Sequence, residues 1–442
     1  MRTQLRAGSS LRDISPGKGV SLGGYPHHPR PNTGVHDPLY AACLYLSDGQ
    51  TQLALVTLDI IGLSKTNVQK IRERAGKASG IQGNHIMISC SHSHSAPRGS
   101  SNMTMDVFET QAAPDEVYVA KVVDSAVAII TEAAVAAVPA ELGIEKGFCG
   151  REQGVGGNRR DPLGPADPEV WIIGVKDRSG NLLAVLVKYA LHPTFLHSDN
   201  FLASADYPGY IRSYINSRFP ETVFLFAQGT SGNQSPRYFR SGKTFNEAER
   251  VGTAIGREAE RVLQQMSFSG NVPLCVKSRE IMLDLRTFPK KEAAEAHVEK
   301  ARKAWHTLRD SEAPEPDVWN AELLFLGAED TLSMLLLYEN GELAALNENS
   351  PMEVQVLGIG DVRIVCLPGE IFVEYGITIQ YRSPFPKTFV IELANGALPG
   401  YAATEQAYAS GGYETGASML TGKSGLQLVE TAVELLFETR QE

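Results

Sequence analysis

The stretch that most constrains this chain is residues 85–99, where a short apolar run gives way to a polar turn. Residues 86–88 are continuously apolar, which is typical of a buried strand. His92 and His94 follow among small polar residues, and a proline and a glycine then end the regular structure. In an extended segment, an i, i+2 pair places both imidazoles on one side of the backbone. Imidazole is the commonest metal ligand and this spacing suits Zn²⁺; unliganded loop histidines are the alternative.

Polar or Gly/Pro-rich turns follow five separate apolar runs that predict strands. These ends are Asp59, His92 with His94, His192, the loop Asn233–Ser235, and Pro368-Gly369-Glu370. In sheets built from strand–helix units, sites form beyond the carboxyl ends of the strands. The pattern therefore predicts a site with His92 and His192 as imidazole ligands and Glu370 as an oxygen ligand. Each has a structural alternative: His192 can be a core histidine, and Glu370 can stabilise the start of the next segment.

The hydrophobic pattern predicts a mixture of strands and helices. Strands are predicted at 86–88, Leu39–Leu46, Leu53–Leu58, Val170–Val175, Leu182–Ala190, Val223–Ala227 and Thr388–Glu392, and between Thr331 and Val365. Helices are predicted at Ser64–Lys77, Val117–Val138, Tyr210–Arg218, Glu247–Met266, Lys290–Asp310 and Leu426–Glu438. Residues 1–37 are turn-rich, and Glu312–Asp317 is a linker-like break. The expected fold is α/β (mixed α+β), a layered domain with mixed parallel and antiparallel β-sheets flanked by helices.

The composition is that of a globular protein and argues against several classes of function. The 442 residues are 43% hydrophobic, which is enough for a large core. The net charge of −10, without a concentrated block of Lys and Arg, argues against nucleic-acid binding. Five scattered cysteines without a C-x-x-C pair indicate reduced thiols rather than a zinc ribbon or a disulfide framework.

Two further expectations concern location and the remaining histidines. The sequence has no signal peptide and no run long enough to span a membrane, which predicts a cytoplasmic protein unless a leader was removed; it leaves the oligomeric state open. Further histidines are predicted at the surface or in loops: His27, His28, His197, His297 and His306.

Six short motifs are spread along the chain. They are Ser91-His92-Ser93-His94-Ser95-Ala96-Pro97, Asn158-Arg159, His192-Pro193-Thr194, Gly232-Asn233-Gln234-Ser235-Pro236, Leu367-Pro368-Gly369-Glu370, and Gly400-Tyr401 with Tyr413-Glu414. In this order they resemble the neutral (non-lysosomal) ceramidase family, and the segment around Gly34-Val35-His36 and Asp59 looks similar too. The resemblance covers nearly the whole chain. It implies that residues 1–442 form one ceramidase-like catalytic domain, without the family's C-terminal β-sandwich.

The resemblance also implies the site residues. The zinc ligands it implies are His92, His192, Glu370 and Tyr401. The residues it implies around the scissile amide are His94, Arg159 and Tyr413, and Ser235 matches a serine once proposed as the nucleophile in such enzymes. Three of these have structural alternatives. The loop that carries Ser235 can serve through its backbone shape alone, and Tyr401 and Tyr413 can be ordinary half-buried tyrosines.

Together these residues predict a zinc-dependent amidohydrolase that cleaves an N-acyl amide bond. Zn²⁺ lowers the pKa of a bound water to ~7, which gives a nucleophile at neutral pH. His94 and Tyr413 are expected to stabilise the oxyanion or protonate the leaving amine, and Arg159 to orient the substrate's polar head. Asp59 is expected either to accept a hydrogen bond from an imidazole or to cap a helix.

The substrate is less constrained than the chemistry. Ala96 and Arg98 replace two glycines of the family's His-Ser-Gly-Pro-Gly loop, which stiffens the loop and adds a cation beside the metal. The substrate is therefore ceramide, as in sphingolipid metabolism, or a smaller and more polar amide whose acidic group Arg98 binds. A non-catalytic zinc-containing scaffold of the same fold is the alternative outside the enzymes.

Two other hydrolase classes are rejected on local sequence. A metallo-β-lactamase-like site needs Asp-His after its H-x-H, and Ala96-Pro97 occupies that place. A serine hydrolase centred on Ser235 needs a G-x-S-x-G elbow, which the Gly-Asn-Gln-Ser-Pro loop does not match.

Overall fold

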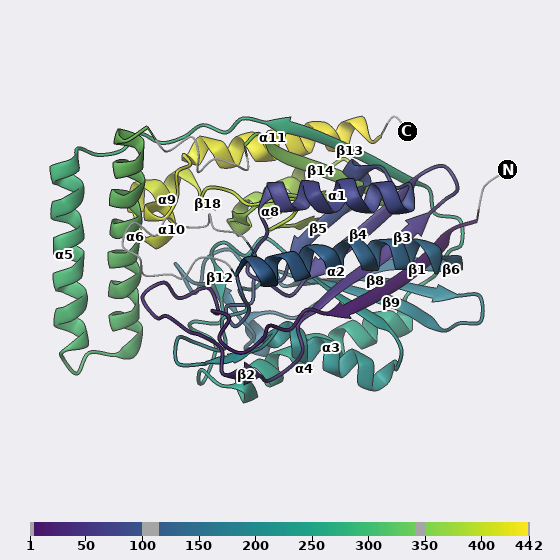
Figure 1. The fold of residues 1–442 in the computed structure, drawn as a ribbon, viewed down its shortest axis with the longest axis horizontal. Helices are drawn as coiled ribbons and strands as arrows, with labels where there is room; N and C mark the ends of the chain where they lie inside the picture. Colours follow the sequence, from purple (N-terminus) through teal and green to yellow (C-terminus); the bar gives the residue numbers. More distant parts are fainter. Residues whose placement is uncertain (1–3, 100–114, 342–349, 441–442) are drawn as a thin grey trace.

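The computed structural model describes residues 4–99, 115–341 and 350–440, and its largest sheet has eight strands in the order β11-β9-β8-β6-β1-β3-β4-β5 (Figure 1). Their bounds are β1 (Arg6–Asp13), β3 (Tyr40–Ser47), β4 (Gln52–Leu58), β5 (Ile86–Cys90), β6 (Val138–Phe148), β8 (Glu169–Asp177), β9 (Leu182–Tyr189) and β11 (Val223–Gln228). β4 pairs with β5, and β9 with β11, in parallel; the other neighbours are antiparallel. β11 also approaches β3, β4 and β5, so the sheet curves.

A second sheet has four strands in the order β13-β14-β15-β17, of which β15 and β17 are parallel. Their bounds are β13 (Leu274–Ile281), β14 (Met352–Ile359), β15 (Val362–Cys366) and β17 (Lys387–Ile391). Three short pairs complete the strands: β2 (Gly34–Val35) with β10 (Leu202–Ala203), β7 (Gly157–Asn158) with β12 (Gln234–Ser235), and β16 (Glu370–Ile371) with β18 (Tyr401–Ala402). The predicted fold class, with mixed parallel and antiparallel sheets, is confirmed.

One apolar cluster joins the two sheets. Alternate side chains of each strand enter it, such as Leu44 of β3 and Leu186 of β9, and they meet Leu357 and Phe389 of the smaller sheet. The side chains at the intervening strand positions, such as Cys43, face helices instead. This two-residue alternation buries both faces of the sheets.

Three helix pairs cover the outer faces of the sheets (Figure 1). They are α1 (Lys65–Ser79) with α2 (Glu116–Val135), α3 (Tyr207–Arg218) with α4 (Phe245–Gln265), and α8 (Val373–Arg382) with α11 (Gly422–Glu438). Short turns of helix occur at η1 (Gly83–His85), η2 (Arg151–Gln153), α9 (Glu405–Ser410) and α10 (Tyr413–Gly416). Local sequence sets the ends of α1, because Ser64 caps its first turn and Gly80 ends it in the left-handed conformation.

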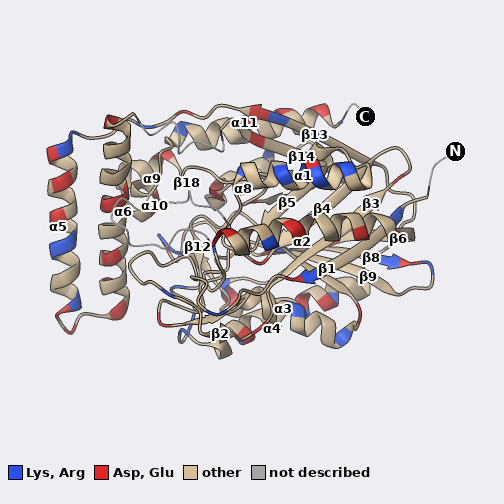
Figure 2. Cartoon of the chain, in the orientation of Figure 1, with Lys and Arg blue, Asp and Glu red and all other residues tan. Residues whose placement is uncertain are grey.

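A hairpin of two long helices, α5 (Lys291–Arg309) and α6 (Glu315–Glu339), stands at the end of the molecule away from both termini (Figure 1). Acidic and basic residues both occur along α5, as predicted for a solvated face (Figure 2). Only Ala294 of α5 is buried, whereas α6 is apolar on most sides and buries eleven of its residues. The linker-like break at 312–317 is therefore the turn of this hairpin and the start of α6.

Several predicted elements are wrong or incomplete. The strand predicted from Thr331 is helical to Glu339, because an apolar run on an all-round apolar helix resembles a buried strand in periodicity. Residues 342–349 lie outside the described residues, and β14 and β15 then confirm the rest of that prediction. The sequence pattern does not predict β1, β6 or β13. β1 lies within residues 1–37, which were expected to be turn-rich. β6 begins at Val138, the last residue of the predicted helix Val117–Val138.

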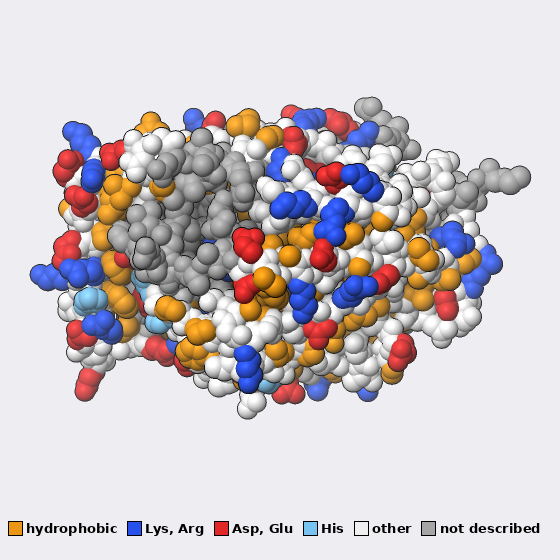
Figure 3. Space-filling view, viewed as in Figure 1, with side chains coloured by type: hydrophobic (Ala, Val, Ile, Leu, Met, Phe, Trp, Pro, Cys, Tyr) orange, Lys and Arg blue, Asp and Glu red, His pale blue; other side chains and the backbone are white. Residues whose placement is uncertain are grey.

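The distribution of surface charge and the state of the cysteines agree with the expectations from composition. On the visible, described part of the face in Figure 3, basic and acidic side chains are intermixed rather than gathered into a basic patch. None of the five cysteines forms a disulfide. Among the described helices, none is both long and apolar enough to cross a bilayer.

Candidate metal centre

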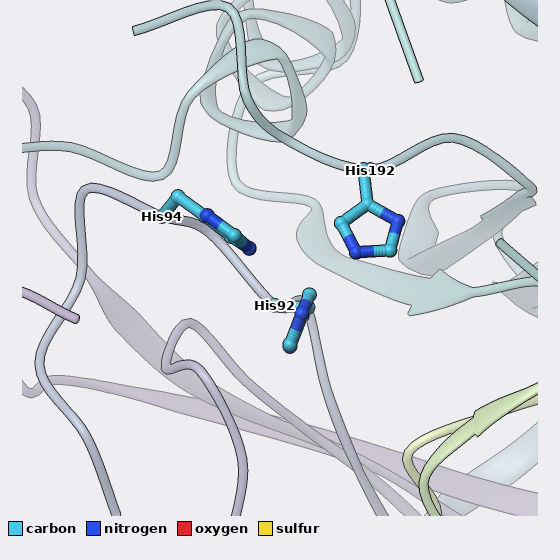
Figure 4. Close-up of side chains that lie close together, drawn as sticks. All are labelled: His92, His94 and His192. Atoms are coloured by element: carbon cyan, nitrogen blue, oxygen red, sulfur yellow. The ribbon is translucent and has the colours of Figure 1, made fainter. Parts of the chain in front are cut away.

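Three histidines from two strand ends meet in one place. His92 and His94 follow β5, His192 follows β9, and their rings turn toward one another (Figure 4). The ring centroids are 4.9 Å apart for His92 and His192, and 5.0 Å for His92 and His94. One nitrogen from each ring can be chosen so that all three lie within 4.8 Å of one another, a spacing at which they could hold a metal ion.

The path of the chain to this cluster differs from the expected one. The prediction that His92 and His94 lie in an extended segment is wrong. His92 has a positive φ of 64°, and the backbone turns directly after β5. The turn is fixed by the backbone N–H of His92, which donates to Ile60 O (3.0 Å), and by that of His94, which donates to Pro193 O (3.1 Å). The second bond ties the two histidine loops together. Gly24 packs so closely on His94 that a Cβ there would lie 2.3 Å from its Nδ1.

Backbone carbonyls fix the orientation of two of the rings. His92 Nδ1 lies 2.7 Å from Ile61 O, and His192 Nδ1 lies 2.7 Å from Ser231 O. A carbonyl only accepts, so both Nδ1 atoms are donors, and each neutral ring keeps its lone pair on Nε2. These Nε2 atoms lie 3.5 Å (His92) and 3.0 Å (His192) from the same oxygen, Glu370 Oε2. Three acceptor atoms therefore converge on one point, which fits a cation between them.

Glu370 and Tyr401 reach the cluster from the C-terminal part of the chain. They are register partners in the short parallel pair β16–β18. Both line a small pocket, here called the inner pocket, together with Ile61, His92, His94, Arg98 and Tyr413. The structure thus brings together the four residues predicted as ligands, and the Tyr401 ring lies 5.8 Å from the Tyr413 ring.

Burial and neighbouring charges shift the pKa values of this cluster. Burial, and then the charges of His92 and His192, lower the pKa of His94 well below its usual range. Burial, and then Arg159, lower the pKa of His192 to about 4. Burial alone would raise the pKa of Glu370, but His92 and His192 hold it well below the usual range. At neutral pH the His94 and His192 rings are therefore neutral and the carboxyl is ionised, the forms that bind metals.

Arg159 lies beside Tyr401, with its guanidinium carbon 5.5 Å from the ring centroid. Its Nε donates to Glu414 Oε1 (2.8 Å) and its Nη2 to Gly232 O (2.7 Å). Glu414 also accepts from Arg160 (2.7 Å), so it anchors both arginines. Arg159 is more buried than Arg160. This favours Arg159 as the site residue, in agreement with the Asn158-Arg159 motif.

Other predicted residues lie at the rim of the cluster or outside it. The hydroxyl of Ser235 accepts from the backbone N–H of Arg237 (3.1 Å), a turn contact. Both expectations for Asp59 are wrong, because its carboxylate pairs with Arg212 (2.7 Å) and Ser64 caps the following helix. Arg98 is buried beside the inner pocket, and its predicted binding of an acidic group stays a prediction.

Two of the histidines predicted at the surface or in loops, His27 and His197, lie in loops but are largely buried. His197 is buried, with its ring 3.8 Å from that of Trp319 on α6. His27 has a side-chain exposure of 11% and bonds Glu322 (3.3 Å) and Glu329 (2.6 Å), also on α6. Their partners lie about 120 to 300 positions away in sequence, so no local pattern could predict these contacts.

Sequence reasoning also missed residues that support the site. Ser231 supplies the carbonyl that fixes His192, and its hydroxyl donates to Glu392 Oε1 (2.6 Å). Glu392 directly follows β17, so the strand-end argument could have found it. A larger outer pocket adjoins the inner one. Besides His94, Tyr401 and Tyr413, it is lined by Arg237, Arg240 and residues of α6.

Comparisons with known proteins agree with this arrangement. No family model matches the chain. The sequence is 25% identical to neutral ceramidase of Pseudomonas aeruginosa over 248 residues, which span 52% of this chain and 37% of that enzyme. The resemblance to neutral ceramidase that the motifs predicted is therefore confirmed in sequence.

Solved structures share the fold. A crystal structure of neutral ceramidase from Pseudomonas aeruginosa has a TM-score of 0.76 at 20% identity, over 99% of this chain and 75% of that chain. A ceramidase complexed with C2 has a TM-score of 0.75 at 17% identity, over 99% and 76%.

Proposed function

Because the chain resembles neutral ceramidase in sequence and shares the fold of its solved structure, we propose that it is a metal-dependent hydrolase of N-acyl amide bonds. We propose zinc as the metal, with His92, His192, Glu370 and Tyr401 as its ligands. The observation that carries the proposal is the convergence of two imidazole lone pairs on one carboxylate oxygen, 3.0 and 3.5 Å away. Without a cation these acceptors repel one another, and imidazole with carboxylate is a ligand set of catalytic zinc.

The chain's own side chains are suited to the other steps of amide hydrolysis. When bound, zinc supplies an acidified water, with a pKa of ~7, as the nucleophile. Burial raises the pKa of Tyr413, which keeps its hydroxyl protonated and able to donate to the amide oxygen or the leaving amine. His94 is neutral and can accept a proton on one nitrogen while it donates from the other. Arg159, held by Glu414, orients the polar part of the substrate.

His94 has a second possible role. Its nitrogens also lie close enough to those of His92 and His192 for a three-histidine metal site. Neither of its ring nitrogens has a hydrogen-bond partner among the described residues, so both roles are open to it. We favour the catalytic role, because Glu370 already completes a set of acceptors with the other two histidines.

Elemental analysis of protein purified without added metal tests the metal centre. We expect about one zinc per chain, and we expect His92→Ala and Glu370→Ala to lose it. His94→Ala should keep the metal and lose about 10²–10³-fold in amide hydrolysis, the usual effect of removing a positioned donor. A metal-free wild-type protein contradicts the proposal, and loss of metal from His94→Ala makes His94 a ligand.

The substrate is tested on a panel that compares ceramide with short N-acyl amino acids. Hydrolysis of either supports the enzyme. Bound metal with no hydrolysis, and ligand binding indifferent to His94→Ala, supports the non-catalytic scaffold instead. The single catalytic domain spanning residues 1–442 and the cytoplasmic location stay predictions.

A further inference from the structure

The outer pocket differs from the inner pocket in its charge. Its inner end is formed by His94, Tyr401 and Tyr413, which also line the inner pocket. Its lining further contains three guanidinium groups, those of Arg159, Arg237 and Arg240. This is a concentration of positive charge in a chain whose net charge is −10.

Two of these guanidinium groups form no ion pair within the described part of the chain. Arg159 pairs with Glu414, but Arg237 donates only to the neutral Asn320 Oδ1 (3.0 Å) and Arg240 only to a backbone carbonyl, Thr194 O. By contrast, Arg250 and Arg261 on the surface of α4 pair with glutamates one turn away. Glu414 acts on Arg237, and Asp206 and Glu315 act on Arg240, only as neighbouring charges, so neither guanidinium group is held in an ion pair.

The one carboxylate in the lining of the outer pocket is already engaged. Glu322 bonds His27 (3.3 Å) and His28 (3.0 Å). Burial, followed by the charge of Arg159, lowers the pKa of Arg237 to about 10, which still leaves this group charged at neutral pH. A half-buried cation without an ion-pair partner is stabilised when an anion binds beside it.

One side of the outer pocket is apolar and aromatic. Trp319, Leu323 and Leu326 of α6 form one wall, and Tyr25 lies 5.9 Å from Trp319 between ring centroids. A molecule that fills this pocket therefore offers an apolar part to α6 and a negative charge to Arg237 and Arg240.

We propose that Arg237 and Arg240 form a subsite for a carboxylate, and that the preferred substrate is an anionic N-acyl amide such as an N-acyl amino acid. This inference rests on the proposed amide hydrolysis. A carboxylate matches the planar fork of a guanidinium and forms charge-assisted hydrogen bonds with it. Ceramide carries no charge and would leave both guanidinium groups without an ion-pair partner.

The test uses a matched pair of substrates with metal-loaded protein. N-hexanoylglycine and N-hexanoylethanolamine share the acyl chain and the amide and differ in a carboxylate against a hydroxymethyl group. We expect wild type to prefer the anionic amide by about 10-fold or more in kcat/KM, as charge-assisted hydrogen bonds allow. We expect Arg237→Gln to reduce this preference about 10–100-fold, chiefly through KM, and Arg237→Lys to restore part of it. Arg178→Gln, at an exposed turn, should leave the preference unchanged.

Two results overturn the subsite. They are equal or better hydrolysis of the neutral amide by wild type, and a preference that Arg237→Gln does not alter. If wild type hydrolyses neither amide, the proposed hydrolysis of such N-acyl amides is contradicted. The subsite is then tested separately, by measuring the binding of N-hexanoylglycine by calorimetry. Binding by wild type that Arg237→Gln weakens at least 10-fold supports it; equal or absent binding refutes it.

Discussion

His92 has the left-handed backbone conformation at the point where the chain leaves β5, with φ at 64°. For a residue with a side chain, such a conformation costs about 1–3 kcal/mol and persists only where neighbouring contacts enforce it. Those contacts are the bonds of its backbone N–H to Ile60 O and of its Nδ1 to Ile61 O. The strained backbone is thus found at the residue, His92, whose Nε2 points toward Glu370.

Glu392 is expected to support the metal centre from outside the ligand set. It accepts from Ser231 Oγ (2.6 Å) and from the backbone N–H of Ile371 (2.7 Å), and Ser231 O holds His192. Glu392→Ala leaves two buried donors unpaired, so we expect the free energy of unfolding of the metal-free protein to fall by roughly 2–4 kcal/mol. Metal affinity should fall about 10–100-fold, measured by competition with a chelator.

Glu392→Gln is the matched control, because it keeps one acceptor oxygen of the same shape. It should retain more stability and more metal affinity than the alanine variant. An unchanged metal affinity in Glu392→Ala would show that the Ser231 loop holds His192 without this carboxylate.

At the residue scale, the sequence predicted which side chains gather but not how they are held. The strand-end argument found His92, His192 and Glu370, because residue type and strand ends are local information. It could not find the carbonyls of Ile61 and Ser231, since any residue type offers a carbonyl. It also could not find the pairing of Asp59 with Arg212, 153 positions away.

At the element scale, a charged cluster fastens the α5–α6 hairpin to the loop before β2. His27 contacts Glu322 and Glu329 of α6, and its ring stacks on Trp305 of α5 with centroids 5.7 Å apart. Burial alone would lower the pKa of His27, but the two glutamates raise it to about 9. His28 is the other titratable group facing Glu322.

This cluster predicts a loss of stability in alkali. The pKa of His27 is raised from 6.5 to about 9 on folding, so its contribution is complete below pH 6.5 and disappears as pH rises through 9. We expect a decrease in the free energy of unfolding on the order of 3 kcal/mol over this range. Urea denaturation followed by tryptophan fluorescence measures it, because Trp305 and Trp319 both lie on the hairpin.

His27→Gln separates this contribution from other alkaline effects. Glutamine can still donate to a carboxylate but does not titrate, so stability should change little between pH 6.5 and 9.5. Parallel losses in wild type and variant would assign the pH dependence to other groups.

Helix–strand ambiguity accounts for the main error at this scale. Residues 332–338 of α6 are almost continuously apolar, and such a run suits a buried strand as well as a buried helix. The amphipathic helices α4 and α5 were predicted to within two residues at nearly every end, because their periodicity is unambiguous.

At the scale of the whole molecule, the two sheets share one core. Trp171 of β8 in the larger sheet stacks on Phe389 of β17 in the smaller, with centroids 4.9 Å apart. Residues after β17 continue to the other sheet, where the backbone N–H of Glu392 donates to Gln228 O (2.8 Å) and that of Asn395 to Ile88 O (2.8 Å). The sheets are therefore expected to unfold together.

Phe389→Ala tests this shared core. Phe389 is fully buried, so its truncation should lower the free energy of unfolding by about 3–5 kcal/mol. Denaturation should remain a single transition by both fluorescence and circular dichroism, and Phe389→Leu should lose less. Two separate transitions would show that each sheet folds independently.

The sequence predicted the fold class but not this joining of sheets. Alternating and continuous apolar runs identify strands, yet they do not say which strands pair. β1 and β13 carry polar and charged residues at half or more of their positions, which hid them. Long-range pairing, such as that of β1 with β6, is settled by tertiary packing rather than by local pattern.

The α5–α6 hairpin contributes to the outer pocket but supplies none of the residues proposed to bind the metal. The residues proposed to bind the metal are drawn from distant segments, each fixed by the scaffold, whereas one wall of the outer pocket belongs to the single stretch 291–339. Exchanging that stretch can change which compounds the protein accepts while the reaction centre stays intact. Evolution, or an engineer, therefore has one contiguous cassette with which to retarget the same chemistry.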